Sequence, residues 1–248
     1  MQALFQTLLY QPIFNALVAL YNIIPDVGVG ILIITVVIKL ALYPLTNSSL
    51  KSQKKLTDIQ PKLQELKVKY KDDKQALATA TMNLYKQEKI SPFSSCLPLL
   101  IQLPFLIAVY QVFRKGLANG QSLEILYKFV NNPGNLNPIS LGLFDLSKPN
   151  IFLAVLAGIA QFWVSKMLIS KKQPNVPGAK DEAMTSIMNK QMLYFMPVIT
   201  VVIGLSLPSG LTLYWFVTTL LTGLQQIYFF KKKEQRKEKE EKRKEEAV

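Results

Sequence analysis

The chain has 248 residues, a formal net charge of +13, no histidine and one cysteine, and half of its residues are hydrophobic. This composition leaves no room for an intrachain disulfide, a CxxC redox pair, a histidine-based zinc site or a triad that needs histidine. The sequence also has no GxxxxGK[ST] loop, which argues against an ATPase. We therefore expect no cofactor and no bond-breaking catalysis.

Apolar residues form continuous stretches near twenty residues long, where a soluble chain would alternate apolar and polar residues at helical or strand period. A helix of that length crosses a hydrocarbon core about 30 Å thick. We expect an all-α polytopic membrane protein, in which residues 25–230 form a core of five transmembrane helices. The expected spans are Gly28–Leu45, Cys96–Phe113, Ile151–Ile169, Met192–Leu207 and Leu211–Phe230.

Residues 1–24 are expected to form an amphipathic helix lying in the outer interface of the membrane, and a sixth span is the alternative. Their polar residues recur on one side, and Pro12 interrupts the run. The segment lacks a basic n-region and an A-x-A-like site, so it does not resemble a signal peptide. The polar residues of this side are Gln2, Gln6, Gln11, Asn15 and Asn22.

Residues 47–90 are expected to form a helical hairpin in the cytoplasm, because their apolar stripes are too modest and their charges too many for lipid. The sequence KDDK predicts the turn between the two arms, and Pro61 should kink the first arm or start a new helix. The stripes consist of Leu50, Leu56, Ile59, Leu63, Leu66 and Tyr70 in the first arm and Ala76, Ala80 and Leu84 in the second.

Lysines predict the orientation. They are concentrated in residues 47–90, in the loop 170–190 and in the tail 231–248, whereas the loop 116–150 has few. By the positive-inside rule the N-terminus lies outside, the loop 116–150 lies outside and the C-terminus lies in the cytoplasm. The net charge then reflects topology and attraction to anionic lipids. Binding of ribosomal RNA is the alternative.

Lys39 lies inside the first expected span with apolar neighbours on both sides. At helical spacing it shares a face with Thr35 and Tyr43, so it can face a water-filled cavity between helices. The alternative is snorkelling, since Lys39 is roughly 9 Å from the cytoplasmic end of the span. Polar or amphipathic residues at depth in other spans favour the cavity, and they are Gln102, Gln161, Tyr214 and Trp215.

Five stretches in this order resemble the YidC/Oxa/Alb family of membrane protein insertases: ITVVIKLALYPLT, DIQPKLQELKVKY, YKQEKISPFSSCLPLLIQLPFLIAVY, FDLSKPN and MPVITVVIGLSLPSGLTLYWFVTTLLTGLQQIYF. The resemblance covers about Gln11–Phe230. One departure concerns Lys39, because the family usually has arginine at that position. The large outer-face domain of some family members is also missing.

The resemblance implies an insertase and chaperone for newly made membrane proteins in a bacterial cell membrane. It implies a hydrophilic groove, open to the cytoplasm and to lipid but closed to the outside, with Lys39 inside it. The implied partners are nascent membrane proteins and the ribosome, the latter through the basic tail and the cytoplasmic loops. The Sec translocon, the signal recognition particle pathway and anionic lipids are further expected partners.

Two other functions compete with this interpretation. A small-solute or ion transporter would use Lys39 as an anion site, but transporters usually show internal repeats with paired broken helices, and no repeat is evident. An intramembrane hydrolase would pair Lys39 with a serine. Its candidates, Ser94, Ser95 and Ser209, all lie at turns or span ends.

Overall fold

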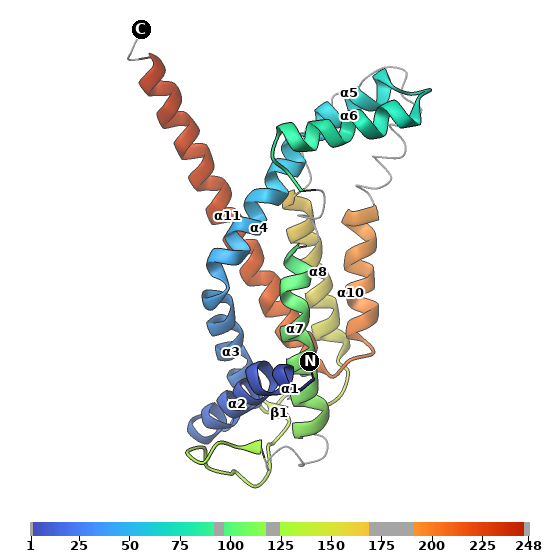
Figure 1. Cartoon of the computed structure of the whole chain (residues 1–248). Coiled ribbons are helices and arrows are strands. Elements are labelled where there is room, and N and C mark those ends of the chain that lie inside the picture. The colour runs from blue at the N-terminus through green and yellow to red at the C-terminus, as the bar shows by residue number, and fades with distance from the viewer. Residues whose placement is uncertain (1, 92–96, 118–124, 169–190, 246–248) are drawn as a thin grey trace.

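The computed structural model describes residues 2–91, 97–117, 125–168 and 191–245, and these are mostly helical (Figure 1). A small antiparallel sheet joins β1 (Ile139–Ser140) to β2 (Phe144–Asp145). Cys96, Ser94, Ser95 and the expected loop 170–190 lie outside the described residues. The chain is therefore a mainly helical protein, as its apolar stretches indicate.

The N-terminal segment is helical without interruption through α1 (Gln2–Phe5), a π-helical turn η1 (Gln6–Tyr10) and α2 (Gln11–Ile23). The expected interruption at Pro12 is wrong, because the helix continues past it; the π-helical turn η1 directly before α2 is the kind of local adjustment that accommodates the N–H group that proline lacks. Figure 1 shows this segment lying across the lower end of the helix bundle.

Two residues on the polar side of the N-terminal segment bind another part of the protein, whereas Gln6 on the same side is exposed. Asn15 is buried, and its side-chain amide donates to the carbonyl of Ile125 at 3.2 Å and accepts from the N–H of Tyr127 at 2.6 Å. Asn22 donates to the carbonyl of Asn131 at 2.8 Å. On the other side, Leu4 and Leu8 are exposed. The amphipathic pattern thus serves to hold the loop that begins at residue 125.

The first expected span contains a sharp bend. α3 (Val27–Ala41) ends there, and α4 (Tyr43–Asp58) begins after Leu42. The angle between the helix Val27–Ala41 and the helical stretch Tyr43–Lys69 is 67°. Pro44 in the first turn of α4 explains the break, since its ring disfavours a continuous helix through this point. The expected span Gly28–Leu45 is therefore not one continuous helix.

α4, α5 (Gln60–Lys69) and α6 (Lys74–Gln87) form an arm that projects from the upper end of the bundle (Figure 1). Pro61 lies in the first turn of α5, and the Asp73 carboxylate caps the first turn of α6. α5 packs on α6 through a small separate core. Its buried residues are Ile59, Leu63 and Ile90, with Leu56, Leu84 and Tyr85 packed against them.

Four further segments complete the bundle: α7 (Leu97–Gln111) with the π-turn η3 (Val112–Leu117), α8 (Ile151–Leu168), η5 (Gln191–Phe195) with α10 (Met196–Gly204), and α11 (Ser209–Glu245). α8 contacts both α10 and α11, and α11 also contacts α3 and α7. Glycines allow these helices to approach one another closely. A side chain at Gly223 of α11 would overlap the indole ring of Trp163 in α8, and one at Gly204 would press on Ala154.

Length and apolarity alone do not fix the number of spans. Among the described residues, the continuous helix Ala3–Ile23 is long and apolar enough to cross a membrane, and α3 with the helices after it passes only as a bent pair. The apolar helices at Leu100–Arg114, Ile151–Met167 and Leu193–Gly204 are shorter. The five-span topology stays a prediction, and so does the interfacial placement of residues 1–24.

Candidate functional site

Lys39 lies on α3 and reaches across to α11. Its Nζ donates to Thr222 Oγ1 at 2.8 Å, and Thr222 in turn donates to the carbonyl of Thr218 one turn earlier, also at 2.8 Å. The lysine is half-buried. The ammonium is therefore held between two helices by a neutral hydroxyl, without an acidic partner among the salt bridges of the described residues.

Thr35 lies one helical turn before Lys39, about 6 Å along the axis. It is only 1% exposed, and its hydroxyl donates to the carbonyl of Ile31 at 2.6 Å within the same helix. Thr35 therefore lies deeper in the protein than Lys39, and its hydroxyl is already satisfied.

Gln102 of α7 donates a hydrogen bond to the hydroxyl of Tyr214 of α11. Tyr214 is 1% exposed and Gln102 is half-buried. The structure thus brings together two of the residues that the sequence proposed for one site. This contact joins α7 to α11, the helix that also binds Lys39 of α3.

A further polar contact lies beyond the bend. Thr46 of α4 and Gln225 of α11 are hydrogen-bonded, with Gln225 Nε2 3.0 Å from Thr46 Oγ1. We call the six residues joined across these helices the polar seam. They are Lys39, Thr46, Gln102, Tyr214, Thr222 and Gln225.

Sequence reasoning missed Thr46, Thr222 and Gln225, although a signal for the α11 residues was present. Positions 214, 218, 222 and 225 follow the i, i+4, i+8, i+11 spacing of one helix face, so the last apolar stretch carries a polar stripe. Thr46 carries no such signal, because only the bend at Leu42 directs it toward α11.

Besides Thr35, which bonds within its own helix, three predicted site residues lie outside the polar seam. Tyr43 follows the bend, is 39% exposed and belongs to α4, so its expected place on one helix face with Thr35 and Lys39 is wrong. Gln161 and Trp215 are half-buried, and within the described part of the chain no hydrogen bond joins them to the seam. Their role in binding stays a prediction.

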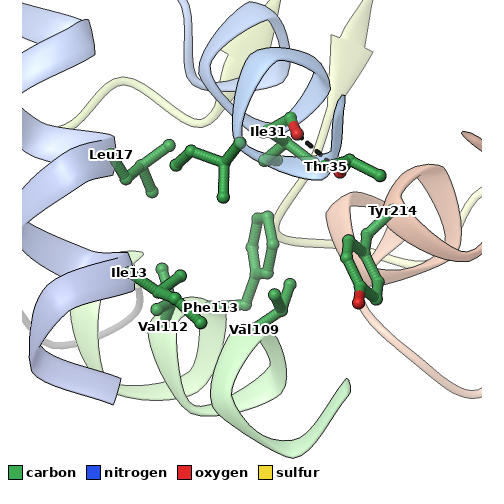
Figure 2. Close-up of a pocket in the computed structure, with 9 residues that line it drawn as sticks. Ile13, Leu17, Ile31, Thr35, Val109, Val112, Phe113 and Tyr214 are labelled. Atoms are coloured by element: carbon green, nitrogen blue, oxygen red, sulfur yellow. Dashed lines mark hydrogen bonds between the residues drawn. The ribbon is translucent and has the colours of Figure 1, made fainter. Parts of the chain in front are cut away.

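An apolar cluster closes the bundle on the other side of Thr35. It surrounds a cavity of about 10 Å³ that Figure 2 shows between the N-terminal helix, α3, the end of α7 and α11. Thr35 and Tyr214 complete the lining of this cavity. We call this cluster the apolar plug, and its members are Ile13, Leu17, Ile31, Ile34, Val109, Val112 and Phe113.

The apolar plug continues into the main hydrophobic core. That core joins Phe14 of α2 to Leu136 and Leu146 of the loop after residue 125, and to Leu153 and Leu211 at the starts of α8 and α11. One end of the helix bundle is therefore sealed by packed side chains, and the charge of Lys39 lies on the other side of that seal.

Comparison with known proteins settles the family. The sequence model of the 60Kd inner membrane protein family matches residues 19–238. The chain belongs to this family. A protein named membrane protein insertase YidC from Fusobacterium nucleatum is 35% identical over 201 residues, which are 81% of this chain and 84% of the relative. The family indicates a protein of the bacterial inner membrane.

Other family members are longer. The insertase YidC of Geobacter metallireducens is 34% identical over 89% of this chain, but this chain spans only 36% of that relative. A crystal structure of an active YidC insertase, with its first transmembrane domain resolved, superposes with a TM-score of 0.57 at 26% identity. The match covers 87% of this chain and 45% of the chain in that crystal structure. The resemblance inferred from the five sequence stretches is thus confirmed.

Proposed function

We propose that this chain is a membrane protein insertase and chaperone that helps newly synthesised membrane proteins enter the bilayer. The observation that carries the proposal is the position of Lys39, a half-buried ammonium held by Thr222 between α3 and α11, about one turn from the apolar plug. The family membership and the insertase names of the relatives support the same function.

The proposed mechanism is partitioning assisted by one fixed charge. A client must move a short polar tail, often with a carboxylate, into an apolar slab. An ammonium at mid-depth attracts that carboxylate more strongly than the same charge would in water, because the effective dielectric there is lower. Separation of α3 and α4 from α11 would open a groove lined by the polar seam and shorten the dehydrated path of the tail.

The apolar parts of the client would meanwhile follow the lipid-facing sides of the bundle. Exposed apolar side chains cover these sides of α7, α8 and α10, for example Ile107, Ile159 and Val198. No nucleotide is needed, since burial of apolar surface in lipid drives the process. The membrane potential contributes roughly 2.3 kcal/mol per 100 mV for each negative charge moved outward.

In this proposal the core has five spans, with the N-terminus outside and the C-terminus in the cytoplasm. The apolar plug then faces outside and the α4–α6 arm faces the cytoplasm, where the ribosome delivers clients. The abundance of lysine in residues 47–90 supports this orientation. The Sec translocon and the signal recognition particle pathway are proposed partners because of the family resemblance, and anionic lipids because of the net positive charge.

Charge at position 39 is the property to test. In proteoliposomes we expect Lys39→Arg to insert an acidic-tailed client as well as the parent, because it keeps the charge. Lys39→Gln keeps a polar chain without the charge, and we expect insertion of that client to fall at least fivefold. Equal insertion by Lys39→Gln and the parent would show that the electrostatic mechanism is wrong.

A matched client separates charge from general damage. A variant of the client in which every Asp and Glu of the tail is replaced by Asn or Gln should lose its dependence on position 39, because it offers no side-chain carboxylate to the ammonium. If Lys39→Gln impairs both clients equally, the lysine supports the structure of the protein and does not act on the acidic tail. A transporter would instead require flux of a small anion, which the same proteoliposomes can measure.

A further inference from the structure

The β1–β2 hairpin contacts α3 and α11, the two helices joined by the Lys39–Thr222 hydrogen bond, at their ends near the apolar plug. On the α3 side, Asp26 is the contact point. Its Oδ1 accepts from Val29 N at 3.1 Å and from Ser140 Oγ at 2.7 Å, and its Oδ2 accepts from Leu141 N at 2.7 Å. One carboxylate therefore binds the first turn of α3 and two successive residues of the hairpin.

On the α11 side, β2 and the residues directly after it supply carbonyl groups to the start of the helix. Ser209 N donates to the carbonyl of Lys148 at 2.9 Å, and Gly210 N donates to the carbonyl of Leu146 at 3.0 Å. The buried Ser209 hydroxyl donates to the carbonyl of Asp145 at 2.8 Å. The first N–H groups of a helix have no partner within the helix, so this loop satisfies them.

The approach of the hairpin to α3 is close. A Cβ atom on Gly28 would lie 2.8 Å from the Cβ of Ser140, which is nearer than side chains tolerate. Gly28 is buried in the first turn of α3, where a glycine is otherwise a poor choice for a helix. The contact with the hairpin explains why glycine fits at this position.

We propose that the β1–β2 hairpin is a clasp between α3 and α11, with Asp26 as the positioning residue that holds it closed. The clasp keeps the apolar plug shut and keeps Lys39 opposite Thr222. Any opening between α3 and α11 then starts at the end that is not clasped. Its importance for client insertion rests on the proposed function, but the closure itself does not.

Helix capping is the simpler role for Asp26, and two substitutions separate it from the clasp. Asp26→Ser keeps a good N-cap residue, since serine caps helices about as well as aspartate, but it is too short to bridge Ser140 and Leu141. Gly28→Ala leaves the carboxylate untouched and favours the helix, but it pushes the hairpin away. A capping role predicts little harm from either change.

The test is the reactivity of a cysteine in the apolar plug. Ile31→Cys is introduced with Cys96→Ser, so that the probe is the single thiol, and the full-length protein is placed in lipid nanodiscs without any client. Ile31 is 4% exposed, so a charged, water-soluble maleimide should label the parent slowly. We expect Asp26→Ser and Gly28→Ala each to raise the labelling rate at least tenfold.

Two controls complete the design. Ser147→Ala removes a hydrogen bond to Asp145 in the same loop without touching either helix contact, and it should leave the rate within twofold. A thiol at the exposed Lys51 should react equally in every variant. The clasp is refuted if either Asp26→Ser or Gly28→Ala changes the rate less than twofold, or if Ser147→Ala raises it as much. Because no client is present, failure here leaves the insertase proposal standing.

Discussion

At the scale of single residues, Lys39 is defined by its partner. In the proposed first span, a lysine would be costly if nothing solvated or bound it. Thr222 supplies an acceptor at 2.8 Å, and it does so from a helix that is 183 residues later in the chain. A hydroxyl can release the ammonium to a carboxylate, whereas a paired aspartate would compete with the client for it.

Removal of that hydroxyl should therefore affect stability more than function. We expect Thr222→Val, which keeps the shape but has no acceptor, to destabilise the protein by about 1.5 kcal/mol, because it removes a hydrogen bond to a charged group. Thr222→Ser should be close to the parent. Thermal unfolding in nanodiscs measures both. Acidic-client insertion should survive in Thr222→Val, and a loss as complete as in Lys39→Gln would contradict this division of roles.

Two carboxylates at the plug end of the bundle, Asp26 and Asp145, predict that the stability of the folded protein falls at low pH. Burial raises the pKa of Asp26, but hydrogen bonds from Ser140, Leu141 and Val29 together outweigh it and set the pKa below its ordinary value. Hydrogen bonds from Ser147 and Lys148 lower the pKa of Asp145, against a smaller opposing effect of burial.

A lowered pKa in the folded state stabilises the protein above the unfolded value, which is about 3.9 for aspartate, and that contribution is lost as pH falls through the folded value. We expect the contribution of these two groups to melting temperature to be constant between pH 7 and 5 and to fall below about pH 4. In Asp26→Ser the fall should be smaller. An equally steep fall in that variant would exclude Asp26 as a cause.

At the scale of elements, the helices pack through small residues as closely as membrane helices often do. Gly223 of α11 meets the indole of Trp163 in α8, and Gly158 of α8 meets Val201 of α10. The three helices are therefore closely packed, whereas beyond the apolar plug α3 and α4 meet α11 through polar side chains. This difference places the proposed opening on the α3–α4 side.

A larger side chain at Gly223 should weaken the packing of α11 on α8 and so lower the free energy of unfolding. We expect Gly223→Ala to cost about 1–3 kcal/mol, because its added methyl group displaces the Trp163 ring from a close-packed contact. Trp163→Phe, combined with Gly223→Ala, should recover part of the loss by making room. Leu224→Ala, at an exposed neighbouring position, should change the melting temperature little. Equal effects of Gly223→Ala and Leu224→Ala would contradict the packing explanation.

At the scale of the whole molecule, the two ends of the bundle differ. One end is closed by the apolar plug and the clasp, and the other carries the α4–α6 arm and the extension of α11 (Figure 1). α11 is continuous from Ser209 to Glu245, so the charged tail continues the helix instead of forming a separate segment. The tail sequence alone indicated only a basic segment.

The tail is the proposed contact with the ribosome. Deletion of Lys232–Val248 should reduce co-sedimentation with ribosomes at low salt, and the difference should shrink as salt rises, because contacts with RNA phosphates depend on released counterions. Client insertion from a ribosome-free assay should be unaffected. Unchanged co-sedimentation would mean that the tail is only a solvated charged helix.

The whole molecule also excludes the serine–lysine alternative for Ser209, the one of its three candidate serines that lies among the described residues. Ser209 starts α11, and Thr222, the partner of Lys39, lies thirteen residues later, roughly 20 Å along the axis. Ser209 is buried and donates to Asp145. It cannot act as a nucleophile activated by Lys39.

The sequence by itself determined the helical class and the family, and it singled out Lys39 as a candidate, because continuous apolar stretches and an isolated charge within one are local features. Tertiary structure decided what Lys39 binds, which residues complete the polar seam and where the bundle is closed. Thr222 and the β1–β2 hairpin gain their roles from contacts between segments far apart in the chain. The bend at Leu42, which separates Tyr43 from Thr35, depends on Pro44, a signal visible in the sequence but masked by the apolar residues around it.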